Sequence, residues 1–252
     1  MSTRHLHLTL IALTAFLFVD VSSAQSQSDF AIAGPPINAK LTKDLWATHY
    51  FVHQAMSTAN GIPFKDKSGK VLSDNVQPRD WCLAAIEGTV RVSFQNSTKT
   101  LNYAGTGKES QVDCASILRI NPAIKPWISA TGKSYFTMAA GPFGDGVKGN
   151  KLVPYRTIAV DKKVIPFGTV VFIPDAKGVV IRLPDGTSIN HDGYFYAGDT
   201  GGAIKGAHID VFCGATSTNC FPSFIHSDAK KTFKAIIVTD ASIIENLSAR
   251  HQ

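Results

Sequence analysis

The chain has 252 residues; 44% are hydrophobic and 17% are charged, with 20 glycines and 12 prolines. This length allows one large domain or two small ones with a buried core, and the composition excludes disordered, collagen-like and coiled-coil proteins. Lysine and arginine number 25 against 19 acidic residues, a net charge of +6. That surplus suggests an acidic polymer as partner without choosing among a nucleic acid, a membrane and an anionic polysaccharide.

Residues 1–24 have the features of a secretory signal peptide. Arg4 supplies a positive start, an apolar run extends from Leu8 to Val19, and small residues up to Ala24 suit a cleavage site. The run is shorter than the ~20 residues that a membrane span needs, and no cysteine stands at the cleavage point to carry a lipid. We therefore expect a secreted or periplasmic protein with no stable membrane anchor; a retained N-terminal anchor is the alternative.

Export makes disulfides the default state of the four cysteines. One pair lies in each half of the chain, at Cys82, Cys114, Cys213 and Cys220. Local pairing, 82 with 114 and 213 with 220, is the simplest of the three connectivities. Neither pair has the Cys-x-x-Cys spacing of a zinc site, so we expect no metal and no cofactor.

Residues 25–40 are rich in Ser, Gln, Ala and Pro and are interpreted as a linker. A helix is then predicted over 43–58. The residues at helical spacing are Leu45, Trp46, His49, Val52, His53 and Met56. A second helix is predicted over 79–89, and short strands and loops follow it. We therefore expect a helical or mixed accessory region at residues 41–130.

From about residue 134 the chain changes to short β-rich runs separated by Gly and Pro turns. The six candidate strands are 134–139, 156–160, 169–173, 194–197, 208–212 and 234–239. No long helical pattern separates them, which disfavours a parallel α/β sheet. The pattern predicts a mainly β domain at 131–242, folded as a small barrel, and a C-terminal tail at 243–252.

Two acidic residues in this half are candidates for chemistry. Asp199 lies in a glycine-rich loop, where a bulky ligand can approach its carboxylate. Asp210 lies in a predicted strand that places His208, Asp210 and Phe212 on one side. Two close carboxylates raise each other's pKa, which keeps an acid protonated near neutral pH. The alternative for Asp199 is structural, with its carboxylate accepting hydrogen bonds from its own loop.

Four motifs follow one another: PYRTIAVD from Pro154, VIPFGT from Val164, GDTGGAIKG from Gly198 and HIDVF from His208. In this order they resemble the 3D (three-aspartate) domain, which is shared with the MltA-type lytic transglycosylases of bacterial cell walls. The resemblance covers roughly residues 134–240 and implies a six-stranded double-psi β-barrel. It places the three aspartates at Asp161, Asp199 and Asp210.

The resemblance implies non-hydrolytic cleavage of the MurNAc–GlcNAc β-1,4 bond of peptidoglycan. Asp210 is then expected to protonate the leaving oxygen and afterwards to take the proton of the MurNAc C6 hydroxyl, which closes a 1,6-anhydro ring. Asp199 is expected to support the charge and orientation of Asp210, and Asp161 to serve architecture or substrate positioning. Substrate contacts are expected at Thr200, Gly201, Lys205 and His208.

Two other functions stay open at this point. One is an expansin-like polysaccharide-binding protein without turnover, and the other is a β-1,4-glycan hydrolase with Asp199 as the base. Glu87, in the accessory region, is interpreted as an exposed helix-end residue rather than as a second acid. The expected partners are peptidoglycan glycan strands and no nucleic acid, and the expected state is a monomer.

Overall fold

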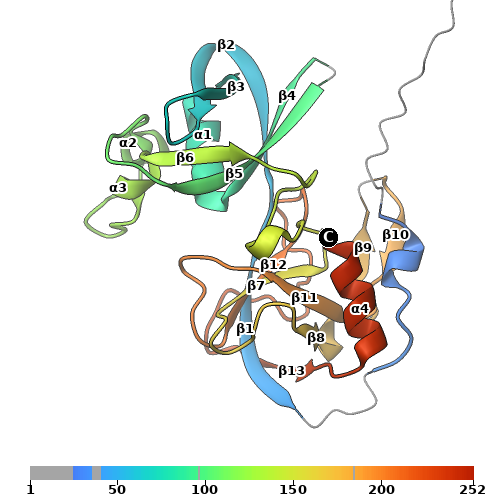
Figure 1. Cartoon of the computed structure of the whole chain (residues 1–252). Coiled ribbons are helices and arrows are strands. Elements are labelled where there is room, and N and C mark those ends of the chain that lie inside the picture. The colour runs from blue at the N-terminus through green and yellow to red at the C-terminus, as the bar shows by residue number, and fades with distance from the viewer. Residues whose placement is uncertain (1–24, 36–40, 96, 184) are drawn as a thin grey trace, which may run out of the picture.

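The computed structural model describes residues 25–35, 41–95, 97–183 and 185–252. The predicted signal peptide lies outside the described residues, as do positions 36–40 of the predicted linker. The described chain forms a closed six-stranded barrel, a separate five-stranded sheet and a two-stranded sheet of β9 (Val180–Arg182) and β10 (Ser188–Asn190) (Figure 1). A mainly β fold with a six-stranded barrel is therefore confirmed.

The barrel closes in the order β1-β12-β7-β11-β8-β13, with β13 pairing back to β1. Its strands are β1 (Thr42–Tyr50), β7 (Thr157–Val160), β8 (Val170–Phe172), β11 (Tyr194–Asp199), β12 (His208–Phe212) and β13 (Phe233–Ile237). Five of these coincide with predicted strands. The sixth is β1, whereas the predicted strand at 134–139 belongs to the other sheet.

The helix predicted over 43–58 is wrong. This segment forms β1 and the start of the next strand, β2 (His53–Lys65). β1 pairs in parallel with β12 and antiparallel with β13, both of which lie far along the chain. The ladder hydrogen bonds to these distant strands decide the conformation, because helical spacing is only a weak local preference.

The accessory unit lies between β1 and β7 in the chain and is built mainly from strands, not helices. Its sheet has the order β3-β2-β4-β5-β6. Its remaining elements are β3 (Val71–Val76), α1 (Pro78–Glu87), β4 (Thr89–Phe94), β5 (Ser97–Thr106), α2 (Cys114–Leu118), α3 (Ile128–Thr131) and β6 (Ser134–Met138). The predicted helix over 79–89 is confirmed as α1, and the chain returns to the barrel after β6.

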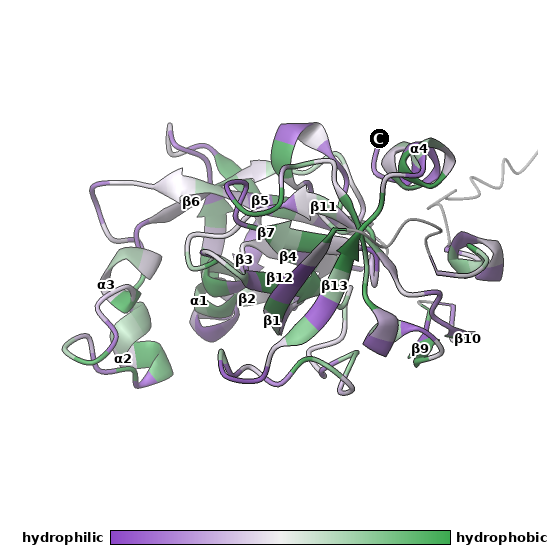
Figure 2. Cartoon of the chain, turned by 90° about the horizontal axis from the view of Figure 1, so that it is seen from below, coloured by the Kyte–Doolittle hydropathy of each residue, from purple (hydrophilic) through white to green (hydrophobic). Residues whose placement is uncertain are grey.

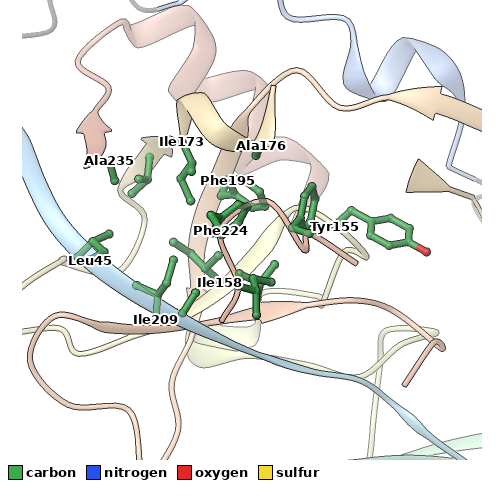
Figure 3. Packing of buried hydrophobic residues seen from close by; sticks show 14 of the residues in the cluster. Leu45, Tyr155, Ile158, Ile173, Ala176, Phe195, Ile209, Phe224 and Ala235 are labelled. Atoms are coloured by element: carbon green, nitrogen blue, oxygen red, sulfur yellow. The ribbon is translucent and has the colours of Figure 1, made fainter. Parts of the chain in front are cut away.

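Each unit has its own hydrophobic core. Alternate residues of β1 and β12 point into the barrel, where Leu45 and Ile209 are fully buried; Figure 3 shows them with Ile158 and Phe195. The accessory core is built around Trp81, which packs on neighbouring aromatic rings. A fully buried Leu, Ile or Phe contributes about 1.5–3 kcal/mol, and each core contains several of them.

Both predicted disulfides are confirmed. Cys82–Cys114 joins α1 to α2 inside the accessory unit. Cys213–Cys220 closes a short loop directly after β12. The Cys213 N–H also donates a hydrogen bond of 2.9 Å to the carbonyl of Tyr50 at the end of β1, so the exit of β12 is fixed to the neighbouring strand.

The segment 25–35, predicted as part of a linker, is instead docked on the barrel. Its short helix η1 (Gln27–Phe30) buries Phe30, which is 4% exposed. The buried guanidinium of Arg156 lies over the Phe30 ring at 4.3 Å and pairs with Asp192 at 2.6 Å. Phe30 thus helps to cover a buried ion pair, and this contact places the segment against the barrel.

The predicted tail also packs against the barrel. Helix α4 (Ala241–Arg250) begins at an Asp240 cap and packs against the barrel through Leu247, and His251 behind it is buried. Figure 2 shows α4 at the opposite end of the molecule from α2 and α3. No helix among the described residues is long and apolar enough to cross a membrane.

Candidate active site

Polar and aromatic side chains form a row on the outside of the barrel. β1 and β12 run in parallel, with Trp46 paired to His208 and Thr48 paired to Asp210. Since Leu45 and the other odd-numbered residues nearby fill the barrel core, these even-numbered residues point outward. The predicted orientation of the Asp210 strand is therefore confirmed.

The barrel brings Asp199 and Asp210 to the same place. Asp210 in β12 and Asp199 at the end of β11 are both register partners of Ala159, because β7 lies between their strands. A register shift in β11 precedes Asp199 and re-aims its side chain. The two carboxyl groups therefore flank a single residue of the central strand.

Asp210 is held by a chain of hydrogen bonds. The Thr48 hydroxyl donates to Asp210 Oδ1 at 2.7 Å and lies 2.8 Å from Nε2 of His208. Because the hydroxyl has one proton, His208 must donate to Thr48 whenever the aspartate is ionised. His208 is 8% exposed and stacks on Trp46 with ring centroids 3.6 Å apart. His208, a predicted substrate contact, is thus connected to Asp210 through the Thr48 hydroxyl.

Asp199 has one partner from its own loop and one from β1. The Thr200 N–H donates to Oδ1 at 2.8 Å, and the Tyr50 hydroxyl donates to Oδ2 at 2.7 Å. The first bond is the local one expected of an aspartate in a turn. The second ties the carboxylate to the same strand that holds Asp210, so both carboxyl groups are positioned by β1.

Both carboxyl groups hold their protons more tightly than usual. Burial raises the pKa of Asp210 to about 6, against the opposing effects of the Thr48 hydrogen bond and the nearby His49. Burial also raises the pKa of Asp199 to about 6, and the charge of Asp210 adds to this effect. Both groups are therefore partly protonated near pH 6.

A third carboxyl group reaches the same place from the accessory unit. Glu87 is the last residue of α1, which ends at Gly88 in a left-handed conformation (φ 84°). Its Oε2 accepts a hydrogen bond of 3.4 Å from the N–H of Phe51, between β1 and β2. Burial, with a further contribution from the Asp210 charge, raises the pKa of Glu87 to about 7. The interpretation of Glu87 as an exposed residue is therefore wrong, although it does end a helix.

Three residues of the site were absent from the predicted set. Trp46, Thr48 and Tyr50 were assigned to a helix that does not form. These residues occupy every second position, and the apolar Leu45 and Ala47 alternate with them. This alternation is the signal that could have identified an outward strand face.

The third aspartate does not join the pair. Asp161 lies just past β7, where it accepts hydrogen bonds from the N–H groups of Lys163 (3.0 Å) and Gly206 (2.9 Å). These bonds, with nearby lysines, lower the pKa of Asp161. The bond from Gly206 attaches the end of β7 to the loop that contains Thr200 and Lys205.

Beside this loop is a hollow of about 370 Å³. It is lined by Asp161, Lys162, Lys163, Phe167, Thr200, Ile204 and Lys205. Two predicted substrate contacts, Thr200 and Lys205, therefore line one hollow; Gly201 lies between them in the chain. In the described part of the chain no three His, Cys, Asp or Glu side chains gather as metal ligands.

Solved structures with a similar fold are lytic transglycosylases by name. MltA from E. coli with bound chitohexaose is 18% identical, covers 77% of this chain and 71% of its own, and has a TM-score of 0.48. A membrane-bound lytic murein transglycosylase from Agrobacterium tumefaciens is 15% identical over 80% and 76% of the two chains, with a TM-score of 0.47. LtgG of Burkholderia pseudomallei is 20% identical over 78% and 71%, with a TM-score of 0.40.

At these TM-scores the likeness is a weak one, and no curated protein sequence matches the chain. The family model of the 3D domain does match, over residues 156–220. This range begins at Arg156, directly before β7, and ends at Cys220. It contains Asp161, Asp199 and Asp210. The part of the chain that carries both paired carboxyl groups is therefore the part that matches the 3D domain.

Proposed function

We propose that the protein is a lytic transglycosylase of peptidoglycan, which cleaves the MurNAc–GlcNAc β-1,4 bond without water. The observation that carries this proposal is the pairing of Asp199 and Asp210 within the 3D domain, each with a pKa of about 6. A carboxyl group with such a pKa is partly protonated near neutral pH and can act as an acid and then as a base.

Asp210 is the general acid in this proposal. Its proton goes to the glycosidic oxygen as the bond to the MurNAc C1 breaks. The carboxylate left on Asp210 then takes the proton of the MurNAc C6 hydroxyl, whose oxygen bonds to C1 and closes the 1,6-anhydro ring. The proton that Asp210 gave away is thereby returned, so one residue completes the cycle and no water is consumed.

Asp199 stabilises the positive charge that develops on the sugar as the bond breaks. Its hydrogen bonds from Tyr50 and Thr200 favour the ionised form and fix its direction. An ionised Asp199 in turn disfavours ionisation of Asp210 and so helps to keep the acid protonated. The pair thus divides into one charged and one neutral carboxyl group.

The setting of this reaction follows from the same proposal. Peptidoglycan lies outside the cytoplasmic membrane, which agrees with the two disulfides and with a signal peptide at residues 1–24. The net charge of +6 suits a wall polymer that bears carboxylate groups. We propose that the secreted or periplasmic protein acts as a monomer, with no membrane anchor.

Product analysis tests the proposal. Purified protein is incubated with peptidoglycan, and the soluble products are separated and identified by mass spectrometry. Products that end in 1,6-anhydro-MurNAc are expected. Reducing ends would show a hydrolase with Asp199 as base, and retention on peptidoglycan without products would show an expansin-like binding protein.

The variant Asp210→Asn is expected to lower the rate of anhydro-product formation at least 1,000-fold, because the acid and the base are lost together. Asp74→Asn is the matched control, since Asp74 is exposed on β3 of the accessory sheet. Anhydro products formed by Asp210→Asn at the normal rate would refute the role of Asp210.

A further inference from the structure

The hollow beside Asp161 has the composition of a site for an anionic group. Three of its lining residues are the exposed lysines Lys162, Lys163 and Lys205. Its one acidic residue is Asp161. Each carboxylate oxygen of Asp161 already accepts a hydrogen bond from a backbone N–H group. Three lysines and one aspartate therefore line the hollow, and the excess of positive charge is available to a ligand.

The rest of the hollow suits a ligand with an apolar part. Phe167 and Ile204 line it, and Ile204 is 5% exposed, so this wall is firmly packed. The loop that carries Lys205 is fixed at Gly206, whose N–H donates to Asp161. A small organic acid with a methyl group would place its carboxylate toward the lysines and its methyl toward the apolar wall.

The hollow lies next to the candidate active site along two segments of the chain. Thr200 lines it and directly follows Asp199. Asp161 is two residues beyond Ala159, the residue that the two carboxyl groups flank. At the usual rise of a strand, two residues correspond to about 7 Å. A ligand in the hollow can therefore belong to the same molecule as a bond placed between Asp199 and Asp210.

We propose that this hollow binds the carboxylate-bearing substituent of a muramic acid residue next to the bond that is cleaved. This inference rests on the proposed function and names the feature of the glycan that the site selects. The carboxylate has two sources in peptidoglycan: the lactyl group itself, in glycan without peptides, or the stem peptide attached to it. Neutral glycans of GlcNAc have neither group.

The test measures the binding of glycans to a variant that is expected not to cleave them. Three ligands of equal sugar number are titrated against the full-length Asp210→Asn protein: chitohexaose, glycan with free lactyl groups, and glycan with stem peptides. The lysines are then changed in this background by Lys162→Ala/Lys163→Ala and by Lys205→Ala. The backbone N–H of Lys163 remains in each variant, so the bond to Asp161 is kept. Lys230→Ala/Lys231→Ala, another exposed pair, controls for net charge.

Each lysine variant is expected to weaken binding of a carboxylate-bearing glycan on the order of tenfold and to leave chitohexaose unchanged. The loss should shrink at 1 M salt, where exposed charges are screened. A loss confined to free lactyl glycan identifies the lactyl carboxylate, and one confined to the other glycan identifies the peptide. Equal weakening of all three ligands, or no weakening, overturns the inference. If the parent protein binds none of the three, the proposed function itself fails.

Discussion

At the scale of single residues, Thr48 holds a central place in the site. Its hydroxyl lies between Asp210 at 2.7 Å and His208 at 2.8 Å. With Asp210 ionised, the hydrogen bonds run from His208 to Thr48 to the carboxylate. With Asp210 protonated they can run the other way, so the hydroxyl accommodates both states of the acid. Thr48 therefore positions the residue that is proposed to exchange a proton twice in each cycle.

Removal of this hydroxyl should change the pH dependence of the reaction. The Thr48 hydrogen bond lowers the pKa of Asp210, so Thr48→Val should raise it. Since the acid must be protonated, kcat/KM falls as pH rises through this pKa, and the variant should move that fall upward by roughly one pH unit. Thr48→Ser keeps the hydroxyl and should leave the profile in place. Identical profiles for the two variants would contradict the role of the hydroxyl.

The sequence singles out the two paired acids as candidates but not the side chains that hold them. Asp199 and Asp210 lie in local motifs whose glycines and alternation can be recognised over a few residues. Thr48 is 162 residues from Asp210, and its contribution depends on a strand pairing that no local pattern reveals. The prediction for Glu87 is wrong for the same reason, because its carboxyl group contacts Phe51, which is distant in the sequence and lies between β1 and β2.

At the scale of elements, β1 shows why the helix prediction failed. A half-buried strand is recognised by apolar residues on one face only. In β1 the inner face is apolar through Leu45 and Ala47, but the outer face carries Trp46 and Tyr50 because it forms the site. Large aromatic side chains on the outer face, next to apolar ones on the inner face, make the period of two hard to recognise. The aromatic residues that form the site therefore made β1 difficult to predict as a strand.

The two disulfides should differ in their contribution to stability. Cys82–Cys114 closes a loop of 32 residues and Cys213–Cys220 one of 7. By loop-closure entropy the first is worth about 4 kcal/mol and the second about 2 kcal/mol. Urea unfolding of Cys82→Ser/Cys114→Ser should therefore show the larger loss, provided that each disulfide acts on the unfolded chain. An equal or greater loss in Cys213→Ser/Cys220→Ser would assign the second bridge a native-state role in holding β12.

At the scale of the whole molecule, Glu87 connects the stability of the protein to its site. Its folded pKa of about 7 exceeds the ordinary 4.5, so the folded protein keeps a proton that the unfolded chain has lost. Stability should therefore fall as pH rises from about 4.5 to about 7. This loss of folding stability follows from placing a carboxyl group of the accessory unit beside Asp210. Active sites commonly lower the stability of a protein in this way.

The variant Glu87→Gln should remove that cost. Its amide oxygen can still accept the hydrogen bond from Phe51, but no charge forms. We expect the variant to be about 1–2 kcal/mol more stable than the parent at pH 8 and equal to it at pH 4, as measured by urea unfolding. Glu245→Gln, on the exposed side of α4, is the control and should show no such difference. A variant less stable than the parent at pH 8 would contradict this account.

The pairing of β1 has a further consequence for how the chain acquires its structure. β1 is the first barrel strand in the chain, yet its partners β12 and β13 are among the last elements. The accessory sheet, by contrast, finds all its partners within residues 53–138. Short-range contacts form faster than long-range ones, so the accessory sheet should assemble first and the barrel should close around β1 only when the C-terminal strands are available. Catalytic competence is then acquired last, when β12 inserts between β1 and β7.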